Sequence, residues 1–302
     1  MRTIEQHLDV ILGQANPSEP LEVELLGSVG CVLAEDVTVD DDGKPHVVLN
    51  KGTRLAARHV ALIAAAGFGH VLVHPKPRVV IMTVGDELVN PGKPDGRPDI
   101  NGVALTAAAT AAGAMTFRVG PVASDTETIR VAIEDQLVRS DILVLACGMS
   151  SSDYDLVTGV VRELGRVEFL KVAVQPGSAQ GFGYIGPDST PVFVLPGNPV
   201  GALLSFDLFV RPLVRRLMGQ MKLHHQTTHA TLENSVKQVP ELTQYVRAVF
   251  DEKKSTVRSL EGDIEHPLAA LGAADSLIIV SPGDKAINKG ERVSVMKLDE
   301  HE

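Results

Sequence analysis

The sequence predicts an α/β fold, in which a doubly wound sheet domain lies between a mixed N-terminal segment and a small all-β unit. Short apolar runs, as at 142–146, alternate along the middle of the chain with patterns of helical spacing, as at 201–218. Such alternation is typical of right-handed βαβ units and a mostly parallel sheet. After Gly219 short strand patterns follow one another with little helix, which indicates a sandwich or a barrel.

Length and composition limit the class of protein. At 302 residues the chain exceeds one ordinary domain, and an apolar fraction of 44% suffices for a substantial core. Aromatic residues make up 4% and Trp is absent, so we expect that core to be aliphatic. The net charge of −10 argues against nucleic acid or an anionic membrane as the main partner, while a phosphorylated small ligand stays compatible with it.

Cysteine usage and hydropathy bear on the compartment. Cys31 and Cys147 offer neither a disulfide framework nor the spacing of a metal site, which suits a reducing environment. No apolar run approaches the length of a membrane span, and the first residues lack the apolar stretch of a signal peptide. We therefore expect a cytoplasmic protein without a membrane span.

The N-terminal part mixes short elements. We expect an amphipathic helix over 1–12, a strand at 37–39, an alanine-rich helix at 58–66 and a strand at 71–73. Prolines then mark a linker. With the change of pattern after Gly219, this predicts domains at 1–75, 76–219 and 220–302.

The middle part is regular. The expected order is strand 79–83, helix 103–112, strand 116–119, helix 128–138, strand 142–146, helix 156–164, strands 167–174 and 192–195, and helix 201–218. Ser124 and Glu127 have the spacing of a capping box before the helix at 128–138.

The turn after strand 142–146 is the first candidate site. Ligands of open α/β sheets bind at the carboxyl ends of the strands. Backbone amides near Gly148 and the small serines after it would hold an oxyanion. Asp153 and Asp155, which we place in this turn ahead of the helix, would hold a cation or accept from a ligand; a simple helix cap at Asp153 is the equal alternative.

The all-β part carries little sign of chemistry. Its expected strands are 229–232, 244–250, 256–259, 277–280 and 292–298, and its longest helix is 267–274. His224, His225 and His229 lie near its start, and we expect them at the surface rather than in a metal site.

Five short motifs occur in a fixed order. They are Gly85-Asp86-Glu87-Leu88, Asp99-x-Asn101, Gly148-x-Ser150 with Asp153-Tyr154-Asp155, Pro176-Gly177, and Pro196-Gly197-Asn198-Pro199-Val200. Each is weak alone, but the series followed by an all-β tail resembles the molybdopterin molybdenumtransferase (MoeA) family, which includes the E domain of gephyrin. The resemblance is clear from Lys51 onward, and it implies a MogA-like sheet domain and a C-terminal β-barrel.

The resemblance also implies a function. Such enzymes insert molybdate into adenylylated molybdopterin, release AMP, use Mg²⁺ and form homodimers. Carried over to this chain, catalytic roles fall to Asp86, Asp125 and Asp155, and metal binding to Asp86 and Asp155. Substrate contacts fall to Gly85, Glu87, Asp99, Asn101, Gly148, Ser150, Asp153, Pro176, Gly177, Ser178, Pro196, Gly197, Asn198 and Pro199. For the Pro-Gly-Asn-Pro stretch a rigid turn is the structural alternative.

The chain departs from the family pattern in ways that bear on catalysis. A large inserted domain usual after the first strands is absent near 40–50. Two lysines usual around Pro176-Gly177 are Gln175 and Ser178, and neither replaces an ammonium group that pairs with phosphate or molybdate. A double glycine becomes Cys147-Gly148, and Ser152 and Gly201 replace a usual Gly and Ser.

Two functions therefore compete. One is a molybdotransferase-like enzyme with weak activity. The other is a gephyrin-like dimeric scaffold that binds a partner peptide near the junction of the α/β and β parts. A free pterin-binding, adenylylating domain is disfavoured, because the N-terminal and β segments fit the MoeA arrangement.

Overall fold

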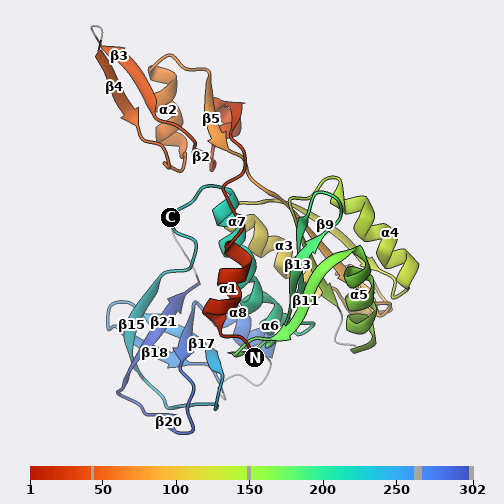
Figure 1. Ribbon diagram of the computed structural model, residues 1–302. Coiled ribbons are helices and arrows are strands. Elements are labelled where there is room, and N and C mark those ends of the chain that lie inside the picture. Colours follow the sequence, from red (N-terminus) through yellow and green to blue (C-terminus); the bar gives the residue numbers. More distant parts are fainter. Residues whose placement is uncertain (42–43, 148–150, 262–266, 299–302) are drawn as a thin grey trace.

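The computed structural model describes residues 1–41, 44–147, 151–261 and 267–298, and Figure 1 shows three bodies. A small N-terminal lobe stands apart at one end. The α/β part and the C-terminal β part lie side by side at the other end, with helix α1 (Ile4–Leu12) running between them. The predicted fold class is confirmed.

Helix α1 belongs with the body of the molecule and not with the lobe that follows it in sequence. Thr3 caps it and forms a capping box with Gln6, and Ile4 and Ile11 are buried in the main core. The lobe is an antiparallel sheet of order β1 (Leu21–Glu24), β5 (His70–His74), β2 (Val32–Leu33), accompanied by helix α2 (Ala57–Ala65) and a hairpin of β3 (Val37–Asp41) and β4 (Lys44–Leu49).

The central sheet has the strand order β11-β13-β14-β10-β6-β9. Its bounds are β6 Arg78–Val84, β9 Met115–Val122, β10 Ile142–Cys147, β11 Gly165–Lys171, β13 Ala179–Ile185 and β14 Thr190–Leu195. Strands β14, β10, β6 and β9 run parallel, whereas β13 and β11 are antiparallel additions. The chain places β9 on one side of β6 and β10 on the other, so the topological switch point lies between β6 and β10. Ligands of such sheets bind there.

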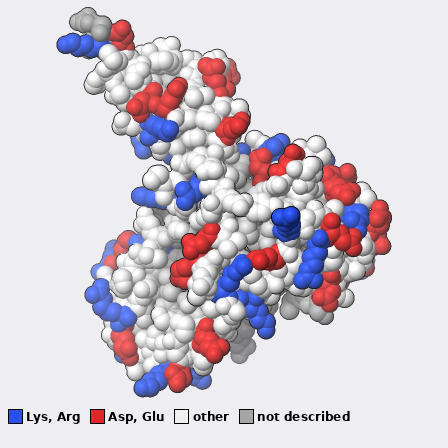
Figure 2. All heavy atoms as spheres, viewed as in Figure 1, with Lys and Arg blue, Asp and Glu red and all other residues white. Residues whose placement is uncertain are grey.

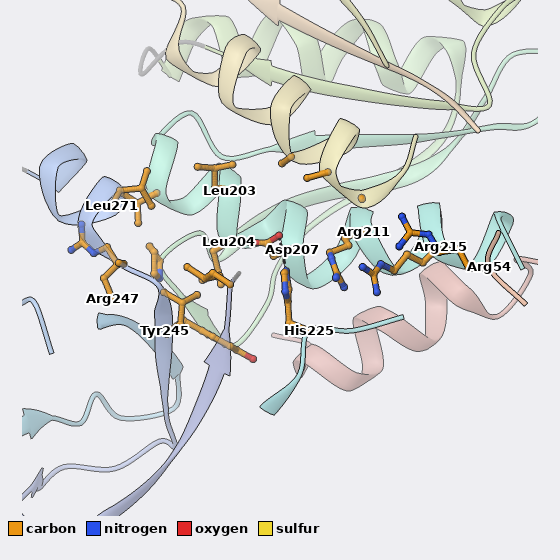
Figure 3. Close-up of a pocket in the computed structure, with 18 residues that line it drawn as sticks. Arg54, Leu203, Leu204, Asp207, Arg211, Arg215, His225, Tyr245, Arg247 and Leu271 are labelled. Atoms are coloured by element: carbon orange, nitrogen blue, oxygen red, sulfur yellow. Dashed lines mark hydrogen bonds and ion pairs between the residues drawn. The ribbon is translucent and has the colours of Figure 1, made fainter. Parts of the chain in front are cut away.

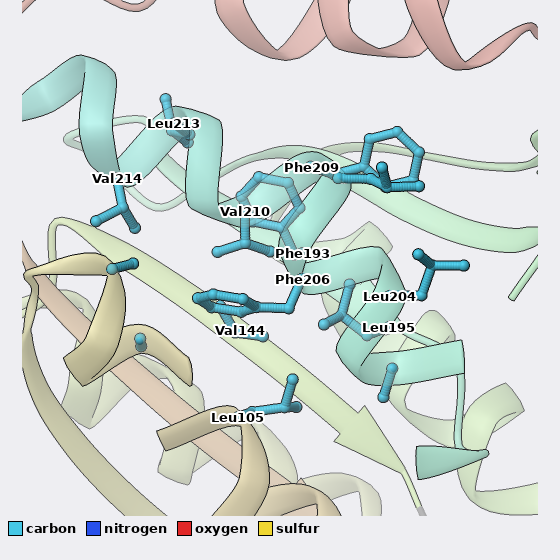
Figure 4. Close-up of a cluster of buried hydrophobic side chains, with 14 of the residues drawn as sticks. Leu105, Val144, Phe193, Leu195, Leu204, Phe206, Phe209, Val210, Leu213 and Val214 are labelled. Carbon is cyan, nitrogen blue, oxygen red and sulfur yellow. The ribbon is translucent and has the colours of Figure 1, made fainter. Parts of the chain in front are cut away.

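Helices cover both faces of this sheet because alternate residues of each strand point to opposite faces. Val80 and Met82 of β6 pack with helices α4 (Thr126–Leu137) and α5 (Ser151–Leu164). Val79 and Ile81 face the other layer, which consists of α3 (Ile100–Ala112), α6 (Pro199–Ser205), a π-helical segment at Phe206–Val210 and α7 (Arg211–Leu217). Helix α6, the π-helical segment and α7 together form the continuous helix predicted at 201–218. Figure 4 shows Phe206 of this helix facing α3 and strand β10.

The C-terminal strands close into a barrel of order β17-β18-β15-β21-β19, since β17 also pairs with β19. Their bounds are β15 Thr227–Leu232, β17 Thr243–Asp251, β18 Thr256–Ser259, β19 Ser276–Val280 and β21 Arg292–Lys297. The short strand β12 (Val174–Gln175) extends this sheet, and helix α8 (Pro267–Ala273) and the pair β16 (Val236–Lys237) and β20 (Ala286–Ile287) complete the unit. No described helix is long and apolar enough to cross a membrane.

Three local predictions are wrong. Asp125, not Ser124, caps α4, because its carboxylate accepts from the amide of Thr128 and the helix begins at Thr126. Helix α5 begins at Ser151, so Asp153 and Asp155 lie inside the helix and not in the turn before it. An acidic residue in a first helical turn is stabilised by the helix dipole, which a pattern of apolar spacing does not reveal. The third error, at His225, concerns a cavity described below.

Candidate functional site

A small pocket of about 130 Å³ lies at the carboxyl ends of β6, β10 and β14, beside the switch point. Its walls come from the loop after β6, the short parallel pair β7 (Leu88–Val89) and β8 (Arg97–Pro98), the start of α3, and the tips of β10 and β14. The lining residues are Glu87, Leu88, Arg97, Pro98, Asp99, Ile100, Asn101, Cys147 and Gly197. We call it the switch-point pocket.

Asn101 joins the tips of strands β10 and β14. Its Nδ2 donates to the carbonyl of Gly197 at 2.8 Å and to that of Cys147 at 3.4 Å. The side chain is 7% exposed, and its Oδ1 has no hydrogen-bond partner within the part of the chain that is described. A buried acceptor without a donor costs free energy, so a ligand N–H directed at this oxygen would stabilise both.

Asp99 fixes the start of α3 beneath the pocket. Its carboxylate, 1% exposed, accepts from Thr83 Oγ1 at 2.8 Å, from the amide of Gly102 at 2.8 Å and from Arg118 Nη2 at 2.7 Å. A Cβ on Gly102 would collide with Asp99 Oδ2 and lie 2.8 Å from Arg118 Nε, so the packing requires glycine here. These three donors make Asp99 a support of the pocket, and sequence reasoning missed its partner Arg118.

Asp86 and Asp125, two of the predicted catalytic carboxylates, hold loops near the pocket and do not line it. Asp86 Oδ1 accepts from the amide of Ser124 at 2.8 Å, which joins the turn after β6 to the end of β9. Asp125 accepts from the amide and hydroxyl of Thr128, and these bonds lower the pKa of its exposed carboxyl. Gly85 shares this loop, where its amide donates to Val122.

Asp153 is a buried acidic residue of α5 that does not itself line the pocket. Its side chain is 5% exposed, and its Oδ2 has no hydrogen-bond partner among the residues described. Burial, and secondarily the charge of Asp153, raise the pKa of the Cys147 thiol to about 12, so Cys147 stays a neutral thiol at the pocket floor. Asp155 is exposed on α5, while Gly148 and Ser150 lie outside the described residues.

The structure tests how well these groups would suit Mg²⁺. Within the described ranges no three His, Cys, Asp or Glu side chains lie close enough to hold a metal ion. Mg²⁺ is commonly bound by one or two carboxylates together with substrate phosphates and water. One unpaired carboxylate oxygen on Asp153 therefore fits an ion shared with a phosphorylated substrate, and it does not fit a protein-only cage.

The Pro176-Gly177 stretch packs against the start of α6, which follows Pro196-Gly197. Asn198 caps α6, because its Oδ1 accepts from the amides of Val200 and Gly201, and Pro199 takes the first helical position. Gly177, at a φ of 89°, packs against Gly201 so closely that a Cβ would lie 3.0 Å from the Gly201 carbonyl oxygen. Gly197 alone of Pro196, Gly197, Asn198 and Pro199 lines the pocket.

Gln175 and Ser178, which stand where the family has lysines, take part in backbone pairing in this chain. Gln175 lies exposed in β12, where it pairs with Gln244 of the barrel, and the Ser178 carbonyl accepts from the amide of Val172. Pro176 lines a different cavity. Sequence reasoning also missed Arg97, a cation at the pocket; only its place between Gly96 and Pro98 in a turn-rich loop pointed toward it.

A second, larger cavity of about 610 Å³ lies where α3, the long helix α6–α7 and the barrel meet (Figure 3). We call it the junction cavity. His225, predicted at the surface, lines it instead: its side chain is 8% exposed, and its Nε2 lies 3.1 Å from Asp207 Oδ1. The chain leaving α7 returns toward that helix before the barrel begins, a tertiary event without a local signal.

Comparisons with known proteins agree with this arrangement. Residues 80–216 match the family described as a probable molybdopterin binding domain, and residues 229–298 match the MoeA C-terminal region, domain IV. Molybdopterin molybdenumtransferase 1 of Mycobacterium tuberculosis is 38% identical over 272 residues, covering 86% of this chain and 64% of the relative. Molybdopterin molybdenumtransferase 2 of the same organism is 31% identical over 260 residues, covering 83% and 64%.

Solved structures support the fold. Two MoeA proteins from Pyrococcus horikoshii superpose with TM-scores of 0.83 and 0.78 at 22% and 17% identity; the first match covers 99% of both chains, and the second covers 98% of this chain and 100% of the other. The fold is thus that of an α/β domain, matched by the probable molybdopterin binding domain family, joined to a MoeA-type C-terminal barrel. The chain belongs to the MoeA family. It spans just under two thirds, 64%, of the length of the curated relatives it matches.

Proposed function

We propose that this chain binds molybdopterin or its adenylylated form at the switch-point pocket and acts in molybdenum cofactor biosynthesis as a molybdotransferase-like protein. The observation that carries the proposal is Asn101, a buried side chain that joins two strand tips and has an acceptor without a partner among the residues described. Family membership supports the choice of ligand. The pocket of about 130 Å³ is smaller than a typical ligand site, so it suits one end of the substrate.

The chain's own groups divide the work in this proposal. Asn101 Oδ1 accepts from an N–H of the ligand, and Arg97 at the pocket rim pairs with a phosphate oxygen. Asp153 would hold Mg²⁺ together with that phosphate, and the ion would supply charge neutralisation at the phosphate oxygens. Asp86 and Asp125 act as positioning residues, because their described bonds go to the loops around the site.

Molybdate insertion is expected to be weak, because Gln175 and Ser178 cannot pair with an anion as lysines do. The full chain, given adenylylated molybdopterin, Mg²⁺ and molybdate, should release little AMP while still binding the pterin in a calorimetric titration. A variant with Gln175→Lys and Ser178→Lys should release AMP faster. Rapid release by the unmodified chain would overturn the weak-activity proposal, and absence of pterin binding would overturn the function itself.

A homodimer is also proposed. The apolar face of α1 is not available for a contact between chains, because Ile4 and Ile11 are buried within the same chain. Apolar side chains are exposed instead on α3, at Ile100 (38%) and Val103 (45%), and on the adjacent edge strand β9. Light scattering should give about twice the chain mass of 32.1 kDa, and a clean monomer would contradict this.

The gephyrin-like scaffold alternative has less support. A cavity does lie at the junction of the α/β and β parts, where that alternative places a partner peptide. At about 610 Å³ it has the size of a small-molecule site. A partner that stays bound after Asp86→Asn would favour the scaffold, and loss of the partner would count against a remote groove.

A further inference from the structure

One wall of the switch-point pocket belongs to the short strand pair β7–β8 and not to the central sheet. Two backbone bonds close this pair. The amide of Arg97 donates to the carbonyl of Glu87 at 2.7 Å. The amide of Asp99 donates to the carbonyl of Val89 at 2.8 Å. Because Glu87 and Arg97 both line the pocket, a movement of the pair would change the shape of the pocket.

Arg118 of the edge strand β9 joins this wall to the start of α3. Its Nη2 donates to Asn90 Oδ1, in the residue after β7, at 2.8 Å and to Asp99 Oδ2, at the cap of α3, at 2.7 Å. This nitrogen carries two N–H groups, so it can make both bonds at once. Asp99 is 1% exposed, whereas Asn90 lies at the surface. We call these two bonds the Arg118 latch, since they connect a buried anchor with a surface loop.

The loop between β7 and β8 is itself compact. A Cβ on Gly96 would collide with the side chain of Val89, so the far end of the loop packs against β7. The amide of Lys93 donates to the carbonyl of Asn90 at 3.0 Å, which closes the near end. A compact loop moves together with its strands, so a bond at Asn90 restrains the whole wall.

Surface charge gives the shape of the pocket additional weight. Figure 2 shows acidic and basic side chains interspersed over one face of the molecule, and the chain carries a net charge of −10. A molecule with these charges does not attract an anionic ligand from a distance. Binding then depends on contacts at short range, and a wall that is held in place before the ligand arrives reduces the entropy lost on binding.

We propose that Arg118 is a positioning residue, which latches the β7–β8 wall to the start of α3 and so holds the switch-point pocket in one shape. It acts through Asn90 on the wall and through Asp99 on the helix, and it is not among the residues that line the pocket. That the latched pocket receives a pterin rests on the proposed function. That the latch holds the wall does not.

The first test removes the surface end of the latch. Substitution of Arg118 itself would leave the buried carboxylate of Asp99 without its cation and would destabilise the fold, so Asn90→Ala is the better variant. Hydrogen exchange, followed residue by residue, should become about three- to tenfold faster at the amides of Arg97 and Asp99. The amide of Gly102, which donates to Asp99 Oδ1, should exchange as before.

Two further variants control this test. Asn90→Asp keeps the shape and the acceptor and presents a carboxylate to the guanidinium, so the two wall amides should exchange as slowly as in the unmodified chain, or more slowly. Lys93→Ala shortens an exposed side chain of the same loop, keeps the backbone bond to Asn90 and should leave exchange unchanged. Unchanged exchange in Asn90→Ala, or equal acceleration in Asn90→Ala and Asn90→Asp, would overturn the latch.

The second test measures ligand binding. In calorimetric titrations with molybdopterin, Asn90→Ala should bind about three- to tenfold more weakly than the unmodified chain, with an unchanged melting temperature. Asn90→Asp should bind more tightly than Asn90→Ala. Faster exchange of the wall amides with unchanged pterin affinity would overturn the positioning role. Absence of pterin binding by every chain, the unmodified one included, would overturn the proposed function alone, because hydrogen exchange decides on the latch without a ligand.

Discussion

The two cavities of this protein are built in opposite ways. The switch-point pocket is small and arises where loops of one sheet meet, and bonds from side chains to backbone hold it together, as between Asn101 and Gly197. The junction cavity is larger and arises where three bodies of the chain meet, with arginines from separate elements in its wall. The switch-point pocket follows from the strand order of an α/β sheet, whereas the junction cavity depends on how this chain packs its lobe, its α/β part and its barrel.

Gly102→Ala should have the largest effect. Of the two cavities, it should disturb only the switch-point pocket. The new Cβ collides with Asp99 Oδ2, which must move away from Arg118 and Thr83. We expect a loss of about 3 kcal/mol in the free energy of unfolding by urea, together with loss of pterin binding.

Gly159→Ala is the matched control, because nothing lies within 4 Å of a Cβ at this helical position. It should stabilise the protein by about 0.5–1 kcal/mol. Equal stability of the two variants would refute the close packing at Gly102.

The pH dependence of stability should arise mainly from His7 of α1, with a smaller contribution from His224, whose pKa burial also lowers. Its side chain is 1% exposed between Phe182 and Phe209, and burial, with a smaller contribution from Arg2, lowers its pKa from 6.5 to about 4. The unfolded chain then binds a proton that the folded chain does not, so this stability is complete above pH 6.5 and is lost as the pH falls toward 4.

The expected loss is about 2 kcal/mol between pH 6.5 and pH 5, measured by urea unfolding. His7→Leu should flatten the dependence within this window. Replacing the exposed His229 should leave it unchanged, and the same slope in both variants would mean that another group titrates.

Asn101→Ala should produce a smaller change in stability and a large change in ligand binding. The carbonyls of Gly197 and Cys147 lose their donor, at a cost of about 1–2 kcal/mol in the free energy of unfolding. Affinity for molybdopterin should fall about tenfold or more, because the unpaired Oδ1 is lost too. Unchanged pterin affinity would place the ligand elsewhere.

The smallest expected effect is on the reactivity of the Cys147 thiol at the floor of the switch-point pocket. Cys147 is 1% exposed with a pKa raised to about 12, and burial also raises the pKa of Cys31. Ellman's reagent at pH 8 should therefore label neither cysteine in the folded protein and both in guanidinium chloride. One fast-reacting thiol that disappears in Cys147→Ser would show that the pocket opens to solvent.

Order and type of elements could be predicted because they depend on local pattern. Apolar runs such as 142–146 identified the parallel strands, and alternation after Gly219 identified the barrel strands. Spacing could not locate caps: at Asp125 and Asn198 the decisive feature is a side-chain oxygen that faces its own backbone amides. The motif at Asp99-x-Asn101 was found, but not that Asp99 supports the helix while Asn101 faces the pocket.

By itself, the sequence determined the α/β pattern, the aliphatic core and the series of motifs at the strand tips, since each depends on residues close together in the chain. Only the tertiary structure decided which polar atoms find no partner in the described part of the chain, such as Asp153 Oδ2, and which cations share a wall, such as Arg54 and Arg247. The physical reason is that burial and charge proximity depend on segments brought together by folding, and no local pattern encodes the distance between them.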